Sequence, residues 1–369
     1  MTKPMISARQ FLFIVILIRI SITVALLPEV TTVAVYQDVW LSGLLATALG
    51  LVIGILHTSL AMRFPGQSIG TFAHQSLGRI LGGLVAMLFG MFFYLMALQR
   101  AQVLSLLIGT TMLRATPIWV LATAALLVGG YGAIMGADVL GRGSEYFITM
   151  IGGLVVTGFA LLFAAPIRGD IGLLRPVLHN GFGPVIDATF PSLLWFASAS
   201  ATVFALGKYC TEPGALRRTV VKGHLVSGFI LVSILLVVVT YVGPRESAQQ
   251  FSPVLSLSRE INVPLLAERL DAVAVSIWMT GLVFDVSVAL LAAGIILGDL
   301  LNIETRWVVL VLSSAAIVLM YFEPVDVFAM RKILSPTSTM LVTGILHVGL
   351  VAFIYLGAVI RGREQGVAR

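Results

Sequence analysis

Residues 11–27 read FLFIVILIRISITVALL, a run in which Arg19 is the single charged residue. Because an α-helix rises about 1.5 Å per residue and the apolar core of a bilayer is about 30 Å thick, roughly 20 residues are needed to cross it. With its apolar neighbours, this run is long enough for such a crossing. It therefore predicts a membrane-spanning helix that carries a positive charge inside the membrane.

The composition of the whole chain indicates a polytopic membrane protein. Hydrophobic residues make up 59% of its 369 residues and charged residues only 11%, and the mean hydropathy is +1.04. A soluble globular domain has a much more polar balance. The single cysteine, Cys210, excludes an internal disulfide, and the histidines and Cys210 lack the spacing of a zinc site. We expect neither a structural metal nor a cofactor.

Apolar stretches of the length needed for a spanning helix recur along the chain, and about ten qualify. We place them at approximately 10–35, 39–62, 81–113, 117–137, 144–166, 187–207, 222–243, 267–300, 305–322 and 336–360. The sequence therefore predicts an all-α fold of about ten transmembrane helices in a lipid bilayer, without a soluble domain.

The distribution of basic residues between the predicted spans indicates the orientation. One side carries Lys3, Arg9, Arg63, Arg79, Arg142, Lys208, Arg217, Arg218, Lys222, Arg306, Arg361, Arg363 and Arg369. The other side carries Arg114, Arg168, Arg175, Arg245, Arg259, Arg269, Arg331 and Lys332. The first side is richer, chiefly in its short loops, so we expect both termini in the cytoplasm. The net charge of +6 reflects this topology and does not indicate nucleic-acid binding.

Three sequence signatures of catalysis are missing. The chain has no Walker A loop, no HExxH motif and no dinucleotide fingerprint after a strand. We therefore do not expect an enzyme.

Ten helices divide naturally into two halves of five. An odd number of crossings per half forces the halves to be inverted relative to each other, the 5+5 inverted repeat of many transporters. We expect one transmembrane domain, 1–369, with a first repeat over 10–166 and a second over 187–360.

The first and sixth predicted helices carry small polar residues at similar depth. Inverted repeats often build a mid-membrane substrate site from two broken helices, and hydroxyl groups can satisfy the freed backbone there. We therefore predict broken helices 1 and 6. The residues expected to contact a small ligand are Ser21, Thr23, Phe196, Ser198 and Ser200, with Tyr94 of the third helix closing the cavity. The alternative is that these small residues serve close helix packing.

Charged residues inside the predicted spans need partners, because each costs about 2.5 to 3.5 kcal/mol at mid-helix. The most deeply placed acid is Asp285, in the run WMTGLVFDVSVALL of the eighth helix. In an inverted repeat this helix packs against the first, so an Arg19–Asp285 pair is plausible. The arginine would then replace the cation that bridges these helices in sodium-coupled relatives of the fold. Alternatively, Arg19 snorkels or meets backbone carbonyls, and Asp285 is a proton site.

The third predicted helix contains FFYLMALQRAQ, in which Gln99 and Gln102 share a face and could line a polar cavity with Tyr94. We expect Arg100 to snorkel at the outer membrane boundary, in a structural role. The histidines at 57 and 347 are interpreted as separate packing residues.

An ordered set of motifs resembles a known family. They are ISARQFLFIVIL, QDVWLSGL, RFPGQSIGTFAHQSLGRILG, LRATPIWVL, YGAIMGADVLGRGSEYF and SLSREINVPLLAERLDAVAVSIWM, which span nearly the whole chain. Together they resemble the B-subunit family of spore germinant receptors. The resemblance implies membership of the amino acid–polyamine–organocation transporter superfamily, and hence the 5+5 fold.

The resemblance also implies a function. Members of that family are permease-like, nutrient-sensing subunits in the spore inner membrane, and they work with an A-type subunit and a C-type lipoprotein. A germinant, expected here to be an amino acid, would bind and trigger germination. An amino acid permease, proton-coupled or uncoupled, is the second hypothesis, and a structural scaffold is the third.

Overall fold

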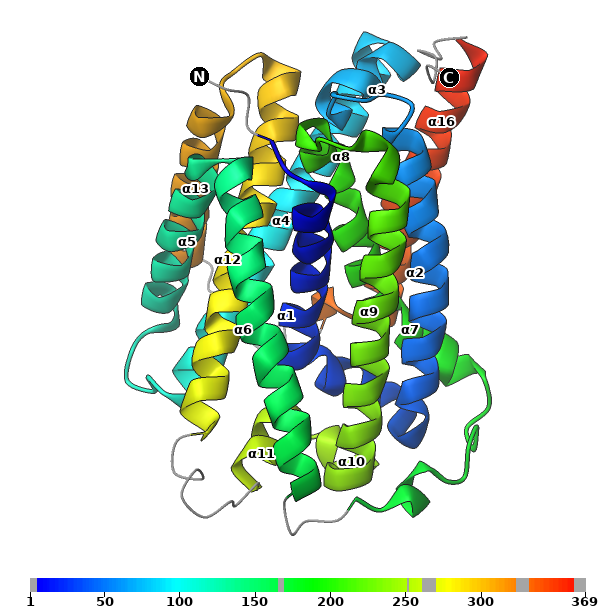
Figure 1. Ribbon diagram of the computed structural model, residues 1–369, viewed down its shortest axis with the longest axis vertical. Coiled ribbons are helices and arrows are strands. Elements are labelled where there is room, and N and C mark those ends of the chain that lie inside the picture. Colours follow the sequence, from blue (N-terminus) through cyan, green and yellow to red (C-terminus); the bar gives the residue numbers. More distant parts are fainter. Residues whose placement is uncertain (1–4, 165–168, 251, 261–269, 323–331, 362–369) are drawn as a thin grey trace.

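The computed structural model describes residues 5–164, 169–250, 252–260, 270–322 and 332–361. The described chain is almost entirely helical and folds into an elongated bundle (Figure 1). Nine of its helical segments are long and apolar enough to cross a membrane, by length and composition of the described residues. Helix α1, with 28 residues, has the length of a tenth. The predicted polytopic all-α architecture is confirmed.

The spanning helices follow the predicted segments closely. They are α1 (Ala8–Val35), α2 (Val39–Ala61), α4 (Arg79–Thr111), α5 (Ile118–Met135), α6 (Ala137–Ala164), α7 (Gly183–Ala201) continued by α8 (Val203–Leu206), α9 (Leu216–Val237) continued by the π-helix η5 (Val238–Val242), α12 (Leu270–Leu301), α13 (Thr305–Phe322), and α15 (Pro336–Val342) continued by the π-helix η6 (Thr343–Leu350) and α16 (Val351–Ile360).

Short helices join the spans at the two ends of the bundle. They are η1 (Tyr36–Asp38), α3 (Ile69–Leu77), η2 (Ile171–Leu174), η3 (Gly207–Tyr209), η4 (Pro213–Ala215), α10 (Pro244–Ser247) and α11 (Pro253–Glu260). Gly136, at φ +94°, lets the chain turn sharply from α5 into α6, a conformation that side-chain-bearing residues rarely adopt.

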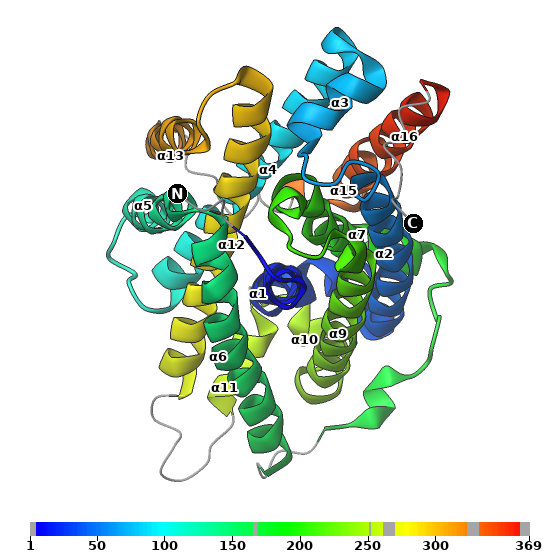
Figure 2. The ribbon, with the colours of Figure 1, turned by 45° about the horizontal axis from the view of Figure 1, so that its top comes forward.

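Helix α1 is the centre of the bundle, as Figure 2 shows in the view along it. It packs against α6, α7, α9 and α12, and the side chains of Ile14, Val15, Leu17 and Ile18 are all fully buried. A helix that is apolar on every side is typical of such a position. Arg19, on the same helix, is therefore also enclosed by protein.

Two interfaces flank α1. Helix α4 packs along α12, and α2 packs against both α7 and α9.

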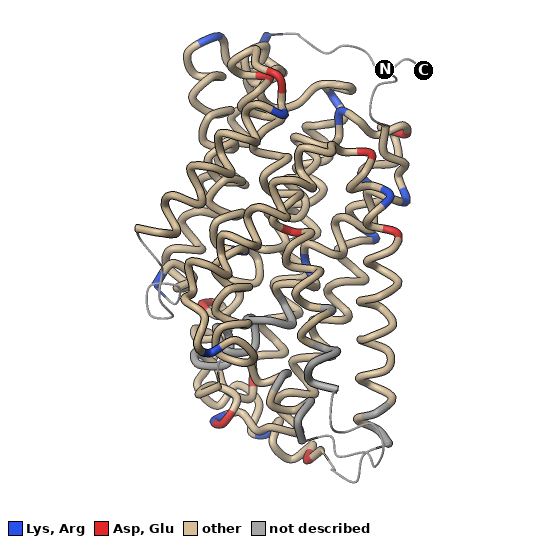
Figure 3. Tube along the Cα trace, turned by 90° about the vertical axis from the view of Figure 1, so that its left-hand side faces the viewer, with Lys and Arg blue, Asp and Glu red and all other residues tan. Residues whose placement is uncertain are grey.

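Lysine, arginine, aspartate and glutamate gather toward the two ends of the bundle, with few at mid-height (Figure 3). The charged residues that do occur at mid-height are the ones that bear on function.

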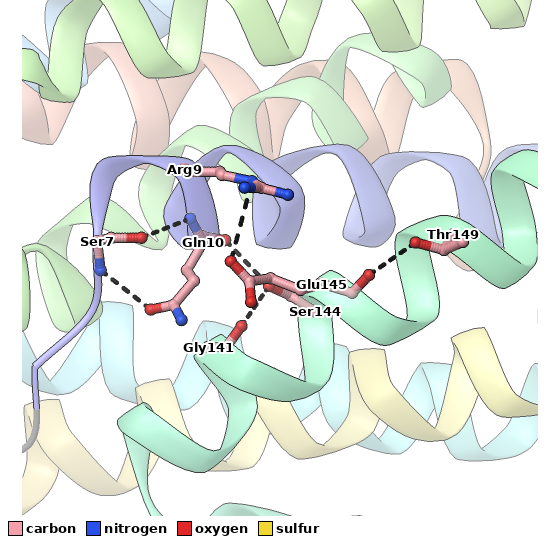
Figure 4. A network of polar contacts seen from close by, with 7 residues as sticks. All are labelled: Ser7, Arg9, Gln10, Gly141, Ser144, Glu145 and Thr149. Atoms are coloured by element: carbon pink, nitrogen blue, oxygen red, sulfur yellow. Dashed lines mark hydrogen bonds and ion pairs between the residues drawn. The ribbon is translucent and has the colours of Figure 1, made fainter.

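The start of α1 is fixed by a capping box and by α6 (Figure 4). The Ser7 hydroxyl accepts from the Gln10 amide at 3.2 Å, and the Ser7 amide donates to Gln10 Oε1 at 3.1 Å. From α6, the Ser144 hydroxyl lies 3.2 Å from the Gln10 carbonyl. Just before the cap, Ile6 forms a short bridge to Cys210, with its amide donating to the Tyr209 carbonyl at 2.8 Å.

The same end of the bundle holds the start of α1, the end of α16 and α3 (Figure 1). Here Lys208 pairs with Asp299 of α12 at 2.7 Å, and the Ser68 hydroxyl donates to the same carboxylate at 2.5 Å. These contacts and the Ile6 bridge tie α1, α3, α12 and the end of α8 together, so this end of the bundle is closed by polar contacts.

The predicted interruption of the first helix is not present, because α1 runs unbroken from Ala8 to Val35. Residues 11–22 contain neither glycine nor proline, and the Ser21 hydroxyl donates to the Leu17 carbonyl at 2.8 Å, a bond that a continuous helix permits. In the sixth span the interruption is a single residue, Thr202, between α7 and α8.

Close approach of α2 and α7 requires a glycine at position 50. A Cβ atom there would lie 2.7 Å from Phe196 Cβ, whereas a Cβ at Gly153 in α6 would meet nothing within 4 Å.

We predict that Gly50→Ala lowers the free energy of unfolding by about 1–3 kcal/mol through overpacking. Gly153→Ala should leave it unchanged or raise it by up to about 1 kcal/mol. Thermal unfolding of both purified variants checks this, and equal stability would contradict it.

Candidate functional site

A fully buried ion pair joins α4 to α12 in the interior of the bundle. Arg100 Nε donates to Asp285 Oδ2 at 2.7 Å, and the two side chains are 1% and 0% exposed. Charges in this environment are costly unless paired and hydrogen-bonded, and in spanning helices they usually mark a functional site. The pair is therefore the starting point for the candidate site.

Polar and aromatic groups surround the guanidinium of Arg100. Its Nη1 donates to Gln99 Oε1 at 3.0 Å, and its Cζ lies 5.9 Å from the centre of the Trp195 ring of α7. Arg19 is close enough for its charge to interact unfavourably with that of Arg100. The site thus combines two arginines and one aspartate from three helices.

The predicted pairing of Arg19 with Asp285 is corrected by this geometry. The ion pair of Asp285 is formed by Arg100, while the Arg19 guanidinium lies over the Phe196 ring at 4.1 Å, a cation–π contact. The physical reason is that α4 packs along α12, whereas Arg19 faces α7. The expectation that Arg100 snorkels at the membrane boundary was also wrong, because its side chain is fully enclosed.

Among the described residues, the hydroxyl groups predicted to contact a ligand lie near carbonyls of their own helices, and Ser200 also lies 2.9 Å from His57 Nδ1 of α2. Ser198 donates to the Trp195 carbonyl at 3.1 Å, and Ser200 lies 3.0 Å from the Ala197 carbonyl. Ser21 bonds to its own helix in the same way. These contacts alone fit the packing alternative, and ligand contact by these residues stays a prediction.

Phe196, Tyr94 and Thr23 are the remaining residues predicted to contact a ligand. Phe196 is fully buried between the Arg19 guanidinium and the His224 ring, whose centre lies 5.1 Å away. Tyr94 is 6% exposed, and its hydroxyl makes no hydrogen bond to the described residues. The side chain of Thr23 lies outside the described residues.

The ion pair leaves several buried polar atoms without hydrogen bonds among the residues that the structure describes. These atoms are Asp285 Oδ1, Arg100 Nη2 and the Trp195 indole Nε1. One is an acceptor and two are donors, and all three belong to the contact between α4, α7 and α12. Such atoms are uncommon inside proteins, and each one needs an explanation.

A second polar contact crosses the bundle at His57 of α2. Its Nε2 donates to the His347 carbonyl at 3.0 Å, and its Nδ1 lies 2.9 Å from the Ser200 hydroxyl. The two histidine rings are 5.4 Å apart between centres. Both histidines were interpreted as separate packing residues, and no spacing in the sequence indicates that they meet. His347 lies on η6, and π-helical segments are often found at functional sites.

The described residues include no group of three His, Cys, Asp or Glu side chains placed to hold a metal ion. What the candidate site offers is charge and hydrogen bonding in an apolar, enclosed environment. Those properties suit the recognition of a small polar molecule.

Comparison with known proteins adds the family context. A family model described as "Spore germination protein" matches residues 5–326. Three similar proteins of Bacillus subtilis (strain 168) are spore germination protein YndE, 26% identical over 280 residues, spore germination protein KB, 24% over 299, and spore germination protein B2, 23% over 271. The matches cover 74%, 79% and 72% of this chain and 75%, 78% and 73% of those proteins, respectively.

Two solved structures share the fold. The first is Mhp1, a nucleobase-cation-symport-1 family transporter in a closed conformation with bromovinylhydantoin bound. Its TM-score is 0.72 and its sequence identity 14%, and the match covers 99% of this chain and 81% of the Mhp1 chain. The second is MhsT in complex with L-phenylalanine, with a TM-score of 0.70, a sequence identity of 11%, and a match that covers 94% of this chain and 88% of the MhsT chain. The predicted transporter-superfamily fold is confirmed.

We predict that breaking the buried pair on one side destabilises the protein more than removing it altogether. Asp285→Asn or Arg100→Met should each lower the free energy of unfolding by about 3–5 kcal/mol, because an uncompensated group stays buried. The double variant Arg100→Met/Asp285→Leu should be more stable than either.

The control for this prediction is the exposed pair Arg142–Asp138, whose side chains are 67% and 36% exposed. Asp138→Asn should change the stability by no more than about 1 kcal/mol. Thermal unfolding in lipid nanodiscs measures all four variants, and a double variant that is less stable than Asp285→Asn or Arg100→Met would contradict the prediction.

Proposed function

The chain belongs to the spore germination protein family, and from this we propose that it is the nutrient-sensing, permease-like subunit of a spore germinant receptor. Its ligand is a small nutrient, an amino acid. The observation that carries the proposal is the Arg100–Asp285 pair, fully buried in the interior of the bundle, because charged residues inside spanning helices usually mark a functional site. A receptor that has kept a permease fold needs such an interior site to sense a molecule.

The position of the ligand follows from the helices that meet around the pair. It lies between α1, α4, α7 and α12, beside Ser21, Thr23, Phe196, Ser198 and Ser200, with Tyr94 at the edge. Support comes from the burial of the described members of this set and from the polar atoms next to them. The L-phenylalanine complex of MhsT shows that a protein of this fold accommodates an amino acid.

The signal is a change in conformation. A ligand shifts an equilibrium only by binding one state more tightly than the other. In this structure the polar atoms beside the ion pair are enclosed, so the bundle must open for a ligand to enter. Closing around the ligand moves α1 and α7, and these movements alter the contacts with partner subunits.

The partners proposed are an A-type and a C-type germinant receptor subunit in the spore inner membrane. Spore germination protein B2 and spore germination protein A2, both of Bacillus subtilis, are similar to this chain. Both termini of this chain face the cytoplasm in this proposal, which agrees with the start of α1 and the end of α16 lying at the same end of the bundle (Figure 1). The two inverted repeats occupy 10–166 and 187–360.

An amino acid permease is the second candidate. The likeness to Mhp1, a transporter, favours it, and Asp285 would be its proton site. In that case the purified protein alone would move its substrate across a membrane, whereas a receptor subunit binds without appreciable flux.

We predict that an amino acid raises the thermal unfolding temperature of the purified protein. Under the receptor proposal, vesicles that contain the protein alone accumulate no labelled amino acid above vesicles without protein. Thermal unfolding against the twenty amino acids, followed by uptake of those that stabilise, measures both. Uptake that depends on the protein would favour the permease, and no stabilisation by any amino acid would contradict both functions.

The variant Ser198→Leu/Thr23→Leu tests the position of the ligand. We expect it to lose the stabilisation by the amino acid, because the added bulk fills the contact between α1 and α7. Thr149→Leu is the matched control, since Thr149 also bonds to its own helix, at 3.0 Å, but is exposed. A normal ligand response in the first variant at normal protein level would place the ligand elsewhere.

A further inference from the structure

The Arg100–Asp285 pair forms one of the two parallel hydrogen bonds that an arginine and a carboxylate can share. Arginine and carboxylate side chains frequently pair through two parallel hydrogen bonds. Here the single bond is from Arg100 Nε to Asp285 Oδ2, while Asp285 Oδ1 and Arg100 Nη2 have no hydrogen-bond partner among the described residues. A buried charged group that leaves hydrogen-bonding capacity unused is unfavourable.

Asp285 Oδ1 and Arg100 Nη2, the two atoms of the pair without partners, suit ligand groups of opposite charge. Asp285 Oδ1 accepts hydrogen bonds and carries negative charge, so it suits an ammonium group. Arg100 Nη2 donates and carries positive charge. The Trp195 ring, whose centre lies 5.9 Å from Arg100 Cζ, carries an indole N–H that also lacks a partner among the described residues, so the two donors suit a carboxylate. An α-amino acid presents an ammonium and a carboxylate on one carbon atom, which is the same pair of charges at short separation.

We propose that the Arg100–Asp285 pair recognises the zwitterion of an α-amino acid, an inference that rests on the function proposed above. The ligand ammonium binds Asp285 Oδ1, and the ligand carboxylate binds Arg100 Nη2 and Trp195 Nε1. Each charged end of the ligand thus meets the opposite charge of the pair, and the ligand connects α12 to α4 and α7.

The unbroken first helix gives this assignment its physical reason. In a broken helix, backbone amides and carbonyls are free to bind the ends of a substrate. Helix α1 is continuous, so the backbone amides and carbonyls next to Arg19 are hydrogen-bonded within the helix, and in α7 the Ser198 hydroxyl bonds to its own helix. The charged side chains of α4 and α12 supply the polar contacts instead. The charge of Arg19, close to Arg100, further favours a carboxylate there.

The two charged groups of the pair make the site selective. An amine alone leaves Arg100 Nη2 without a partner and brings a second positive charge close to the arginines, and a carboxylate alone leaves Asp285 Oδ1 without a partner. A zwitterion satisfies both atoms and adds no net charge. The site should therefore reject a molecule that keeps the side chain of the amino acid but lacks one of its two charged groups.

Three matched sets of molecules test this selectivity on the full chain in lipid nanodiscs. They are L-alanine, ethylamine and propionate; L-leucine, isopentylamine and 4-methylpentanoate; and L-phenylalanine, phenethylamine and 3-phenylpropionate. Isothermal titration gives each dissociation constant. For a set whose amino acid binds, we expect the amine and the acid to bind more weakly by about 10- to 100-fold, the range for losing a hydrogen bond to a charged group.

Two variants assign the two ends of the ligand. In Asp285→Asn, the amino acid should lose its advantage over the matched acid, because the ammonium has no carboxylate to meet. Trp195→Phe leaves the ion pair intact and is expected to fold even if Asp285→Asn does not. It should weaken binding of the amino acid by about 5- to 10-fold and leave binding of the amine unchanged. Asp138→Asn, in an exposed pair, is the control.

The outcomes separate this inference from the proposed function. If an amino acid binds but its amine or acid binds equally well, or if Trp195→Phe weakens amine and amino acid alike, the zwitterion assignment is overturned while amino acid sensing stands. If none of the twenty amino acids binds, including L-alanine, L-leucine and L-phenylalanine, the proposed function fails, and the zwitterion assignment fails with it.

Discussion

The interior charges of this bundle are the constraint on which the rest of the structure depends. Taking a guanidinium and a carboxylate out of water is costly, and a single close contact offsets that cost only if the surrounding protein holds both groups in place. Here α4 and α12 pack along each other and bring Arg100 to within 2.7 Å of Asp285. Helix α1, which is buried from Ile14 to Ile22, adds Arg19 to the same region.

The consequence is a transporter fold whose interior polarity comes from side chains. Helix α1 is continuous, and the break in the sixth span is reduced to Thr202. Next to Arg19, the backbone groups that a broken helix would expose are therefore satisfied, and Arg100, Asp285 and Trp195 each contribute a buried polar atom without a partner among the described residues. At one end of the bundle, Lys208, Asp299 and the Ile6 bridge hold the helices together. Ligand entry must begin with movement elsewhere.

The spans could be predicted from the sequence because apolar length is a local property, and α2 (Val39–Ala61) and α13 (Thr305–Phe322) match their predicted ranges almost to the residue. The pairing of charges could not. Arg19, Arg100 and Asp285 lay far from the ends of their predicted spans, and which arginine meets Asp285 depends on the rotation of each helix and on its neighbours. The meeting of His57 with His347, 290 positions apart, likewise follows only from tertiary packing.

Infrared difference spectroscopy of the Asp285 carboxylate, recorded as the stabilising amino acid is added to the protein in nanodiscs, addresses the ion pair most directly. Asp285→Asn identifies the carboxylate band by its loss. We expect the band to shift on binding in the wild-type protein, because a ligand ammonium joins Arg100 as a partner of that carboxylate. A band that stays unchanged while the amino acid saturates its site would contradict a sensor built around the Arg100–Asp285 pair.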